Sequence, residues 1–181
     1  MKSSFKNELY SWVKSIIFAL LLVMICRHFI FSPIAVKGES MLPTLEDKDK
    51  IVISKVSSVE RFDIVVLQAP DENVYYVKRV IGIPGDSVQV KDDILFINGK
   101  AYKETYVNKD INTILYNKVT ADFKLQDYTS EKTVPEGSYF VLGDNRWKSK
   151  DSREFGFISA RSIIGVVKFQ YYPLQDLGMP K

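Results

Sequence analysis

The residue of this chain best placed for covalent chemistry is Ser40, in the stretch VKGESMLPTL at residues 36–45. Gly38 allows the backbone to approach another group closely, and Pro43 stiffens the chain just beyond the serine, so Ser40 is expected in a turn with its hydroxyl free. Glycine and serine are also ordinary surface-turn residues, and a serine hydroxyl needs a base to act as a nucleophile. The pattern alone therefore leaves a plain turn and a nucleophile both open.

Lys78 is the side chain that could supply the base. Residues 74–81 (VYYVKRVI) read as a strand, and the period of two places Lys78 on one face with Val74, Tyr76 and Val80. An apolar surround disfavours the ammonium ion and lowers a lysine pKa from about 10.4, so the amine could accept a proton from Ser40. The alternative is that Lys78 or Arg79 extends from a half-exposed strand into solvent.

The scarcity of histidine and cysteine excludes several other chemistries. His28 is the only histidine and Cys26 the only cysteine, and both lie at the end of an apolar segment. A Ser-His-Asp triad or a Cys-His pair would have to recruit that histidine. Disulfides within the chain and four-cysteine zinc patterns are excluded, and we expect no metal and no cofactor.

Length, composition and charge indicate one folded domain with an appendage. The chain has 181 residues, of which 46% are hydrophobic and 13% aromatic. Its formal net charge of +3 is carried by the first 31 residues, where Lys2, Lys6, Lys14 and Arg27 outnumber Glu8. The remaining residues are balanced, so we expect no nucleic-acid partner.

Residues 15–31 are expected to form a transmembrane anchor. The run from Ser15 to Cys26 is almost wholly apolar, and a full span needs Trp12 to Phe31 with flanking basic side chains at the interfaces. A cleaved signal peptide has an apolar region of similar length, but no small-residue cleavage site lies close behind it. Because most of the basic residues precede the span, residues 1–14 are predicted to be cytoplasmic and residues 32–181 extracytoplasmic.

Residues 32–181 are predicted to form a mainly β, barrel-like domain. Runs rich in Val, Ile, Tyr and Phe, separated by turn residues, predict strands at 50–55, 63–68, 74–81, 87–90, 94–97, 138–142 and 163–171. Asn98-Gly99 predicts a two-residue hairpin, and residues 159–164 a short helical turn. Residues 101–134 are more polar and are interpreted as an extension.

Four motifs together resemble the type I (leader) signal peptidases of the single-span, Gram-positive-like form. They are GESMLPTL at 38–45, RFDIVV at 61–66, YVKRVIGIPGD at 76–86, and GDN at 143–145 followed by Ser149, Asp151, Ser152, Arg153 and Phe155-Gly156. The motifs occur in the family's order and cover most of the chain after the anchor. The resemblance implies a β-rich serine endopeptidase with a Ser-Lys dyad, which removes signal peptides from secretory preproteins after small residues at positions −3 and −1.

The same resemblance implies a role for each matching residue. Ser40 would be the nucleophile, with its amide binding the oxyanion, and Lys78 the general base. Ser149 would orient the lysine amine, and Asp151 and Arg153 would form a structural ion pair. Asp144 and Asn145 match positions of the supporting loop. The apolar walls of the substrate pockets would include Ile34, Val36 and Val77. Arg79 receives no role.

Gly38 departs from the best-described Gram-negative members, which have a serine there that donates a second oxyanion hydrogen bond. The oxyanion hole is therefore expected to be incomplete or to use another donor.

Proximity to the bilayer is consistent with such a function. Ser40 lies nine residues beyond Phe31, a length that spans at most about 30 Å. Met41 and Leu42 could then contact lipid, or alternatively pack in the core. The phospholipid bilayer and preproteins are the expected partners, and the resemblance leaves room for a contact with the translocon.

Two other protein classes share parts of this pattern. A self-cleaving repressor of the LexA type also uses a Ser-Lys dyad, but this chain has an anchor instead of a DNA-binding domain and no obvious internal Ala-Gly target. An inactive membrane-anchored binding protein could also keep the fold. Retention of Ser40, Lys78 and Ser149 argues against the latter.

Overall fold

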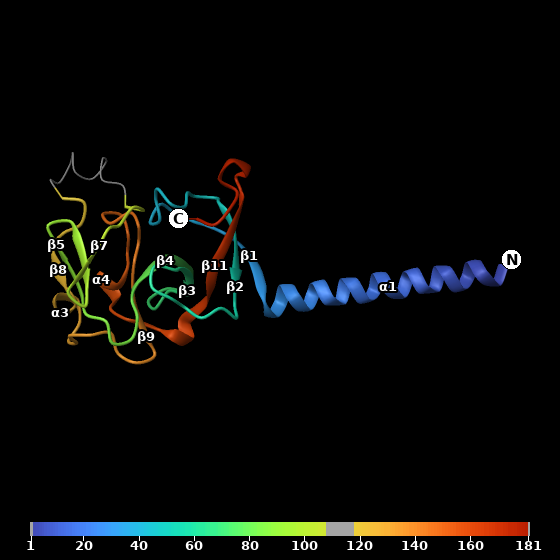
Figure 1. The fold of residues 1–181 in the computed structure, drawn as a ribbon, viewed down its shortest axis with the longest axis horizontal. Coiled ribbons are helices and arrows are strands. Elements are labelled where there is room, and N and C mark those ends of the chain that lie inside the picture. Colours follow the sequence, from blue (N-terminus) through green and yellow to red (C-terminus); the bar gives the residue numbers. More distant parts are fainter. Residues whose placement is uncertain (1, 108–117, 181) are drawn as a thin grey trace.

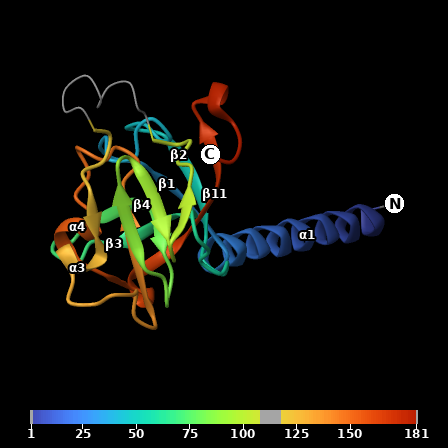
Figure 2. The ribbon, with the colours of Figure 1, turned by 60° about the vertical axis from the view of Figure 1, so that its left-hand side comes forward.

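The computed structural model describes residues 2–107 and 118–180. A long helix, α1 (Lys2–Phe29), projects from a β domain formed by the rest of the described chain (Figures 1 and 2). Its apolar portion, Asn7–Ile25, has 19 residues, none of them buried. At 1.5 Å per residue this portion is about 28 Å long, close to the ~30 Å hydrocarbon core of a bilayer. The helix is thus long and apolar enough to cross a membrane.

The bounds of the helix differ from those of the expected anchor, residues 15–31. The helix begins at Lys2 and ends at Phe29, and Phe31 is already the first residue of strand β1 (Phe31–Ala35). This strand was missed because Pro33 argues against a central strand. The structure places it at the edge of a sheet, paired only with β2 (Lys50–Ser54), where a proline is tolerated.

The larger sheet has seven strands in the order β1-β2-β11-β3-β4-β9-β10, with every described pair antiparallel. Its remaining members are β3 (Ile64–Gln68), β4 (Tyr75–Gly82), β9 (Ser138–Leu142), β10 (Ile158–Ser159) and β11 (Ile163–Tyr172). Central strand β3 is buried at four of its five positions, as its unbroken apolar sequence indicates.

The smaller sheet has four strands in the order β7-β6-β5-β8. They are β5 (Val88–Lys91), β6 (Ile94–Ile97), β7 (Lys100–Tyr102) and β8 (Phe123–Lys124). The predicted hairpin joins β6 to β7, with both Asn98 and Gly99 at positive φ, as a type I′ turn requires. Short helices α3 (Leu125–Tyr128), α4 (Ser152–Phe155), η1 (Ala160–Ser162) and η2 (Leu174–Asp176) complete the domain.

Buried side chains from both sheets form the core. One cluster joins Val88, Val90, Leu95 and Ile97 of the small sheet to Ile81, Phe140 and Leu142 of the large one. The described part of residues 101–134 adds Phe123, Leu125 and Val134 to this cluster. The segment interpreted as an extension therefore contributes to the core that holds the two sheets together.

The mainly β class and the N-terminal helix are confirmed, and the helical turn at 159–164 is present as η1. The described strands pair into two open sheets rather than a closed barrel. The strands missed by the sequence pattern, other than β1, are β7, β8 and β10. They have three residues or fewer, too few to show a period.

Candidate active site

The segment after β1 forms a tight turn around Ser40. Gly38 has φ +84°, which L side chains rarely adopt, and its amide donates to Asp47 Oδ1 over 2.9 Å. Beyond the serine, Met41 is 1% exposed and belongs to the core. Of the two positions expected for Met41, in contact with lipid or packed in the core, the structure shows the second. The turn is thus fixed on both sides of Ser40, which itself stays partly exposed.

Lys78 reaches Ser40 from strand β4. Its Nζ lies 2.7 Å from Ser40 Oγ, while only 2% of the residue is exposed. The same nitrogen lies 5.1 Å from the centre of the Tyr76 ring, on the face predicted from the period of two. Val74, which we also placed on that face, precedes the strand and is 44% exposed. Val74 does not share the face of Lys78 because β4 begins only at Tyr75, and the alternation of faces applies only within the strand.

Burial is the largest influence on the Lys78 amine. Desolvation lowers the pKa of Lys78 from 10.5 to about 8, against the carboxylates of Asp151 and Asp144, which favour the charged form. At pH 7 roughly a tenth of such amines are neutral, compared with far fewer for an exposed lysine. A neutral amine at 2.7 Å can accept a proton from the serine hydroxyl.

The loop after β9 packs directly against the Ser40 turn. The Asn145 amide donates to Ser40 O, and the Asn145 side chain donates to Glu39 O, both over 3.0 Å. A Cβ on Gly143 would lie 2.5 Å from Ser40 O and 2.1 Å from Ser149 Oγ. Only glycine fits there, so Gly143 lets the loop lie directly against the serine backbone, where the Asn145 hydrogen bonds hold it.

Arg79 and Asp144 form a buried, two-pronged ion pair beside the loop. Arg79 Nε and Nη2 bond the two carboxylate oxygens over 2.9 and 2.7 Å, and the side chains are 5% and 0% exposed. Thr44, four residues after Ser40, donates to the same carboxylate over 2.6 Å. Asp144 thus ties β4 to the Ser40 segment, and Arg79, given no role from sequence, is its anchor.

Asp151 and Arg153 form a second ion pair, with 2.8 Å between Arg153 Nη2 and Asp151 Oδ2. Burial raises the Asp151 pKa, but the Arg153 guanidinium and the Gly143 amide outweigh it and hold that pKa below its ordinary value. Gly143 N donates to this carboxylate over 3.0 Å. Asp151 therefore remains an anion and holds the start of the loop.

Ser149 lies in the same cluster. Its hydroxyl is near Asp151 and helps to lower the pKa of that carboxyl. Within the described residues, however, Ser149 Oγ is buried without a hydrogen bond of acceptable geometry. Its proposed bond to the Lys78 amine stays a prediction.

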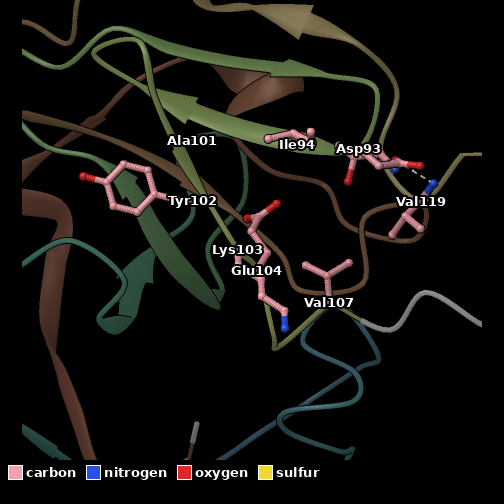
Figure 3. Close-up of a pocket in the computed structure, with 9 residues that line it drawn as sticks. Asp93, Ile94, Ala101, Tyr102, Lys103, Glu104, Val107 and Val119 are labelled. Atoms are coloured by element: carbon pink, nitrogen blue, oxygen red, sulfur yellow. Dashed lines mark hydrogen bonds between the residues drawn. The ribbon is translucent and has the colours of Figure 1, made fainter.

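Ile34, Val36 and Val77 pack together in one apolar cluster beside the Ser40 turn. Val36 and Val77 are 2% and 8% exposed, and Ile34 is partly buried. A different hollow, of about 320 Å³, is lined by residues 93–94, 101–104, 107 and 119–120, among them Asp93, Tyr102 and Glu104 (Figure 3). Neither Ser40 nor Lys78 lines it.

Sequence reasoning missed three polar residues of this region: Thr44, Glu104 and Arg146. Thr44 and Arg146 lie within or next to the serine and GDN motifs, so their position was a usable signal. Glu104 lies in the polar segment that carried no motif, and nothing in its neighbours indicated a buried partner.

Comparison with known proteins supports the class of protein that this site indicates. A model of the family described as signal peptidase, peptidase S26, matches residues 9–172. Signal peptidase I of Bacillus licheniformis is 42% identical over 179 residues, covering 95% of this chain and 93% of the relative. Signal peptidase IB of Staphylococcus aureus is 40% identical, covering 94% of this chain and 93% of the relative.

A crystal structure of a signal peptidase I from Enterococcus faecalis is also similar. It aligns with a TM-score of 0.54 at 42% sequence identity, over 61% of this chain and 97% of that one. Fold and comparisons together define a serine peptidase. More specifically, the chain belongs to the signal peptidase family, peptidase S26.

Proposed function

We propose that this protein is a membrane-bound endopeptidase that removes signal peptides from secretory preproteins, with Ser40 as nucleophile and Lys78 as general base. The observation that carries the proposal is the 2.7 Å contact between Ser40 Oγ and the Nζ of a lysine whose pKa burial lowers to about 8. A serine hydroxyl becomes an effective nucleophile when an adjacent base removes its proton.

The proposed reaction starts from this contact. Neutral Lys78 takes the proton of Ser40 Oγ as that oxygen attacks the carbonyl carbon of the scissile bond. The resulting ammonium then gives the proton to the leaving amine, and the acyl-enzyme forms. A water molecule, deprotonated by the same amine, attacks the acyl-enzyme ester; the ester C–O bond breaks, the ammonium returns its proton to Ser40 Oγ, and the signal peptide leaves with a new carboxyl group.

The Ser40 amide is the first hydrogen-bond donor to the oxyanion of each tetrahedral intermediate. Gly38 has no side chain to add a second hydrogen bond, and nothing lies within 4 Å of the position a Cβ would take. A donor is commonly worth about 2.7 to 4 kcal/mol, so another group or a water is expected to occupy that open space.

Substrate would bind as an extended strand. Strand β9 pairs with β4 only from Arg79 onward, so residues 75–78 have β3 on one side and no described partner strand on the other. An extended peptide can add to such an edge by main-chain hydrogen bonds, which leads its carbonyl groups towards Lys78. Ile34, Val36 and Val77 would form apolar walls that admit only small side chains at −3 and −1.

The membrane location is part of the same proposal, with residues 1–14 cytoplasmic and the β domain outside. Lys2, Lys6 and Lys14 lie before the apolar run that begins at Ser15, which favours retention of that end in the cytoplasm. An uncleaved anchor is favoured because only Ile30 separates α1 from β1, which is already paired with β2. The bilayer then holds enzyme and signal peptide in one layer, close to any translocon.

A processing assay tests the proposal. Detergent-solubilised protein is incubated with a preprotein, and Ser40→Ala and Lys78→Ala are compared with wild type at equal concentration. Both variants should lose processing and keep a wild-type β-sheet circular dichroism spectrum, because neither half of a dyad suffices alone. If Lys78→Ala kept more than a few per cent of wild-type kcat, the dyad assignment would be wrong, and an inactive wild type would favour the binding-protein alternative.

A further inference from the structure

Arg146 is a fully buried cation within the loop that packs on Ser40. Its side chain is 0% exposed, and its Nε donates to Gly143 O over 3.0 Å, which closes the loop on itself. Arg153 Nη2 donates to the Arg146 carbonyl over 2.7 Å. A buried guanidinium is costly unless it is paired and fully bonded, so the partner of Arg146 decides whether this loop keeps its shape.

That partner is Glu104, 42 residues away in the segment without a motif. Both terminal nitrogens of Arg146 contact the Glu104 carboxylate, with 3.1 Å between Nη1 and Oε2. Thr120 Oγ1 accepts a further bond from Nη1 over 3.2 Å. Burial lowers the pKa of Arg146, but the Glu104 charge outweighs it and the net shift is upward, so Arg146 stays charged.

The Glu104 carboxylate is also linked to Arg79, a second buried arginine, through the side chain of Tyr106. Tyr106 donates its hydroxyl to Glu104 Oε1 over 2.7 Å, and the Tyr106 ring lies 3.9 Å from the Arg79 guanidinium carbon. Arg79 in turn holds Asp144, the residue between Gly143 and Asn145. Glu104 thus supports the loop at two points, through Arg146 and through Tyr106 and Arg79.

We infer that Glu104 is a positioning residue for Ser40, acting through Arg146 on the 143–146 loop. The loop transmits this position through the Asn145 amide, which bonds Ser40 O over 3.0 Å. Figure 3 shows Glu104 on the wall of the hollow with Tyr102 and Val107, a wall to which Ser40 does not contribute. The influence of Glu104 on the reaction is therefore indirect, and it matters because Ser40 must be held within a fraction of an ångström of its attack geometry.

The inference rests on the proposed function for its kinetic test. Glu104→Gln removes the charge that pairs directly with the buried Arg146, and kcat should fall about 10- to 100-fold while KM changes less than about threefold. The variant should also melt roughly 6 to 20 °C lower. Assays run well below each melting temperature separate slow turnover from unfolding.

A double variant separates positioning from stability. Glu104→Leu combined with Arg146→Met replaces the ion pair by apolar groups, a change that is often neutral for stability. The melting temperature should return to within about 5 °C of wild type, but kcat should stay at least about 10-fold down because methionine cannot replace the bond that Arg146 Nε donates to Gly143 O. Recovery of both kcat and melting temperature would overturn the inference, since the pair would then be only structural.

The matched control is Asp122→Asn, which removes an exposed ion pair with Lys118 in the same segment. Exposed pairs contribute little, so its kcat and melting temperature should stay close to wild type. A loss as large as that of Glu104→Gln would show a general sensitivity of the segment and would overturn a specific role for Glu104.

Amide hydrogen exchange gives a readout that does not require activity. In the double variant, the Asn145 amide should exchange at least about 10-fold faster, whereas amides of the β5–β6 ladder, such as Val90, should not change. Unchanged exchange at Asn145 would overturn the inference even if the wild-type protein processed preproteins. A wild-type protein without peptidase activity would instead overturn the proposed function, and this exchange measurement would still decide the role of Glu104.

Discussion

At the scale of single residues, the environment of Lys78 accounts for the chemistry proposed for this site. The same burial that makes a charged lysine unfavourable makes a neutral amine available near neutral pH, and Ser40 lies at hydrogen-bonding distance from it. A titrating base of this kind has a definite pH signature.

The first prediction is a pH profile. Because only the neutral amine accepts the serine proton, kcat/KM should rise with pH through a midpoint near the Lys78 pKa of about 8 and level off above it. Initial rates between pH 6 and 10 on one preprotein measure this profile. A flat profile over that range would contradict a lysine base.

Gly38 provides the second residue-scale prediction. Its φ of +84° is one that L side chains rarely adopt, whereas the surrounding space is open. A side chain there costs roughly 1 to 2 kcal/mol in backbone strain. We therefore expect Gly38→Ser to be slower than wild type and less stable.

Gly38→Ala is the matched control, because it imposes the same strain without a hydroxyl. The comparison of kcat and melting temperature for the two variants isolates the effect of the hydroxyl on the oxyanion. A Gly38→Ser enzyme faster than wild type and equally stable would show that strain is unimportant and that the hole lacked a donor.

At the scale of elements, β4 and the 143–151 loop divide the work. The strand is central, so both of its faces are buried. The consecutive residues Lys78 and Arg79 therefore make buried contacts on opposite faces. Lys78 contacts the nucleophile, while Arg79 holds Asp144 and with it the loop. The loop packs on Ser40 through Gly143 and Asn145, which joins strand, loop and serine turn into one unit.

The loop carries the third prediction, for Ser149→Ala. If the Ser149 hydroxyl orients the Lys78 amine, its loss should cost about 1 to 3 kcal/mol of transition-state stabilisation, or roughly 10- to 100-fold in kcat. Stability should change by less than about 1 kcal/mol, because the buried hydroxyl makes no hydrogen bond of acceptable geometry within the described residues. Wild-type kinetics in the variant would remove Ser149 from the catalytic unit.

At the scale of the whole molecule, the arrangement of helix and β domain is consistent with the proposed way in which the enzyme meets its substrate. The apolar helix projects away from the domain, and a single strand separates the helix from the serine turn (Figure 1). If the helix is the membrane anchor that we propose, a site tethered this closely would sample only a thin layer at the bilayer surface. Signal peptides leaving the membrane would enter the same layer.

The fourth prediction concerns orientation. After Cys26→Ser, single cysteines are introduced as Ser3→Cys near the N-terminus and Lys132→Cys on the β domain, where Lys132 is exposed. A membrane-impermeant maleimide applied to intact cells should label the second variant and not the first. Labelling of both after membrane disruption is the control, and the reverse pattern in intact cells would overturn the proposed topology.

Local features of the sequence were enough to predict most elements and the residues proposed for the dyad. Alternating and continuous apolar runs identified the longer strands, and Asn98-Gly99 identified a hairpin, because these signals depend on neighbouring residues alone. Because the chain has no usable histidine, Lys78 is the base that the sequence favours. The turn around Ser40 was likewise indicated by Gly38 and Pro43 within a few residues.

The tertiary structure alone decided which distant residues meet. The 2.7 Å contact of Lys78 with Ser40 depends on how β4 lies beside the turn after β1. Met41 could have faced lipid or core until the fold placed it in the core. Glu104 gave no local signal at all, since a carboxylate in a polar segment usually faces solvent. Its side chain is instead 9% exposed and pairs with the buried Arg146 guanidinium, and such pairings depend on packing between segments that no sequence window contains.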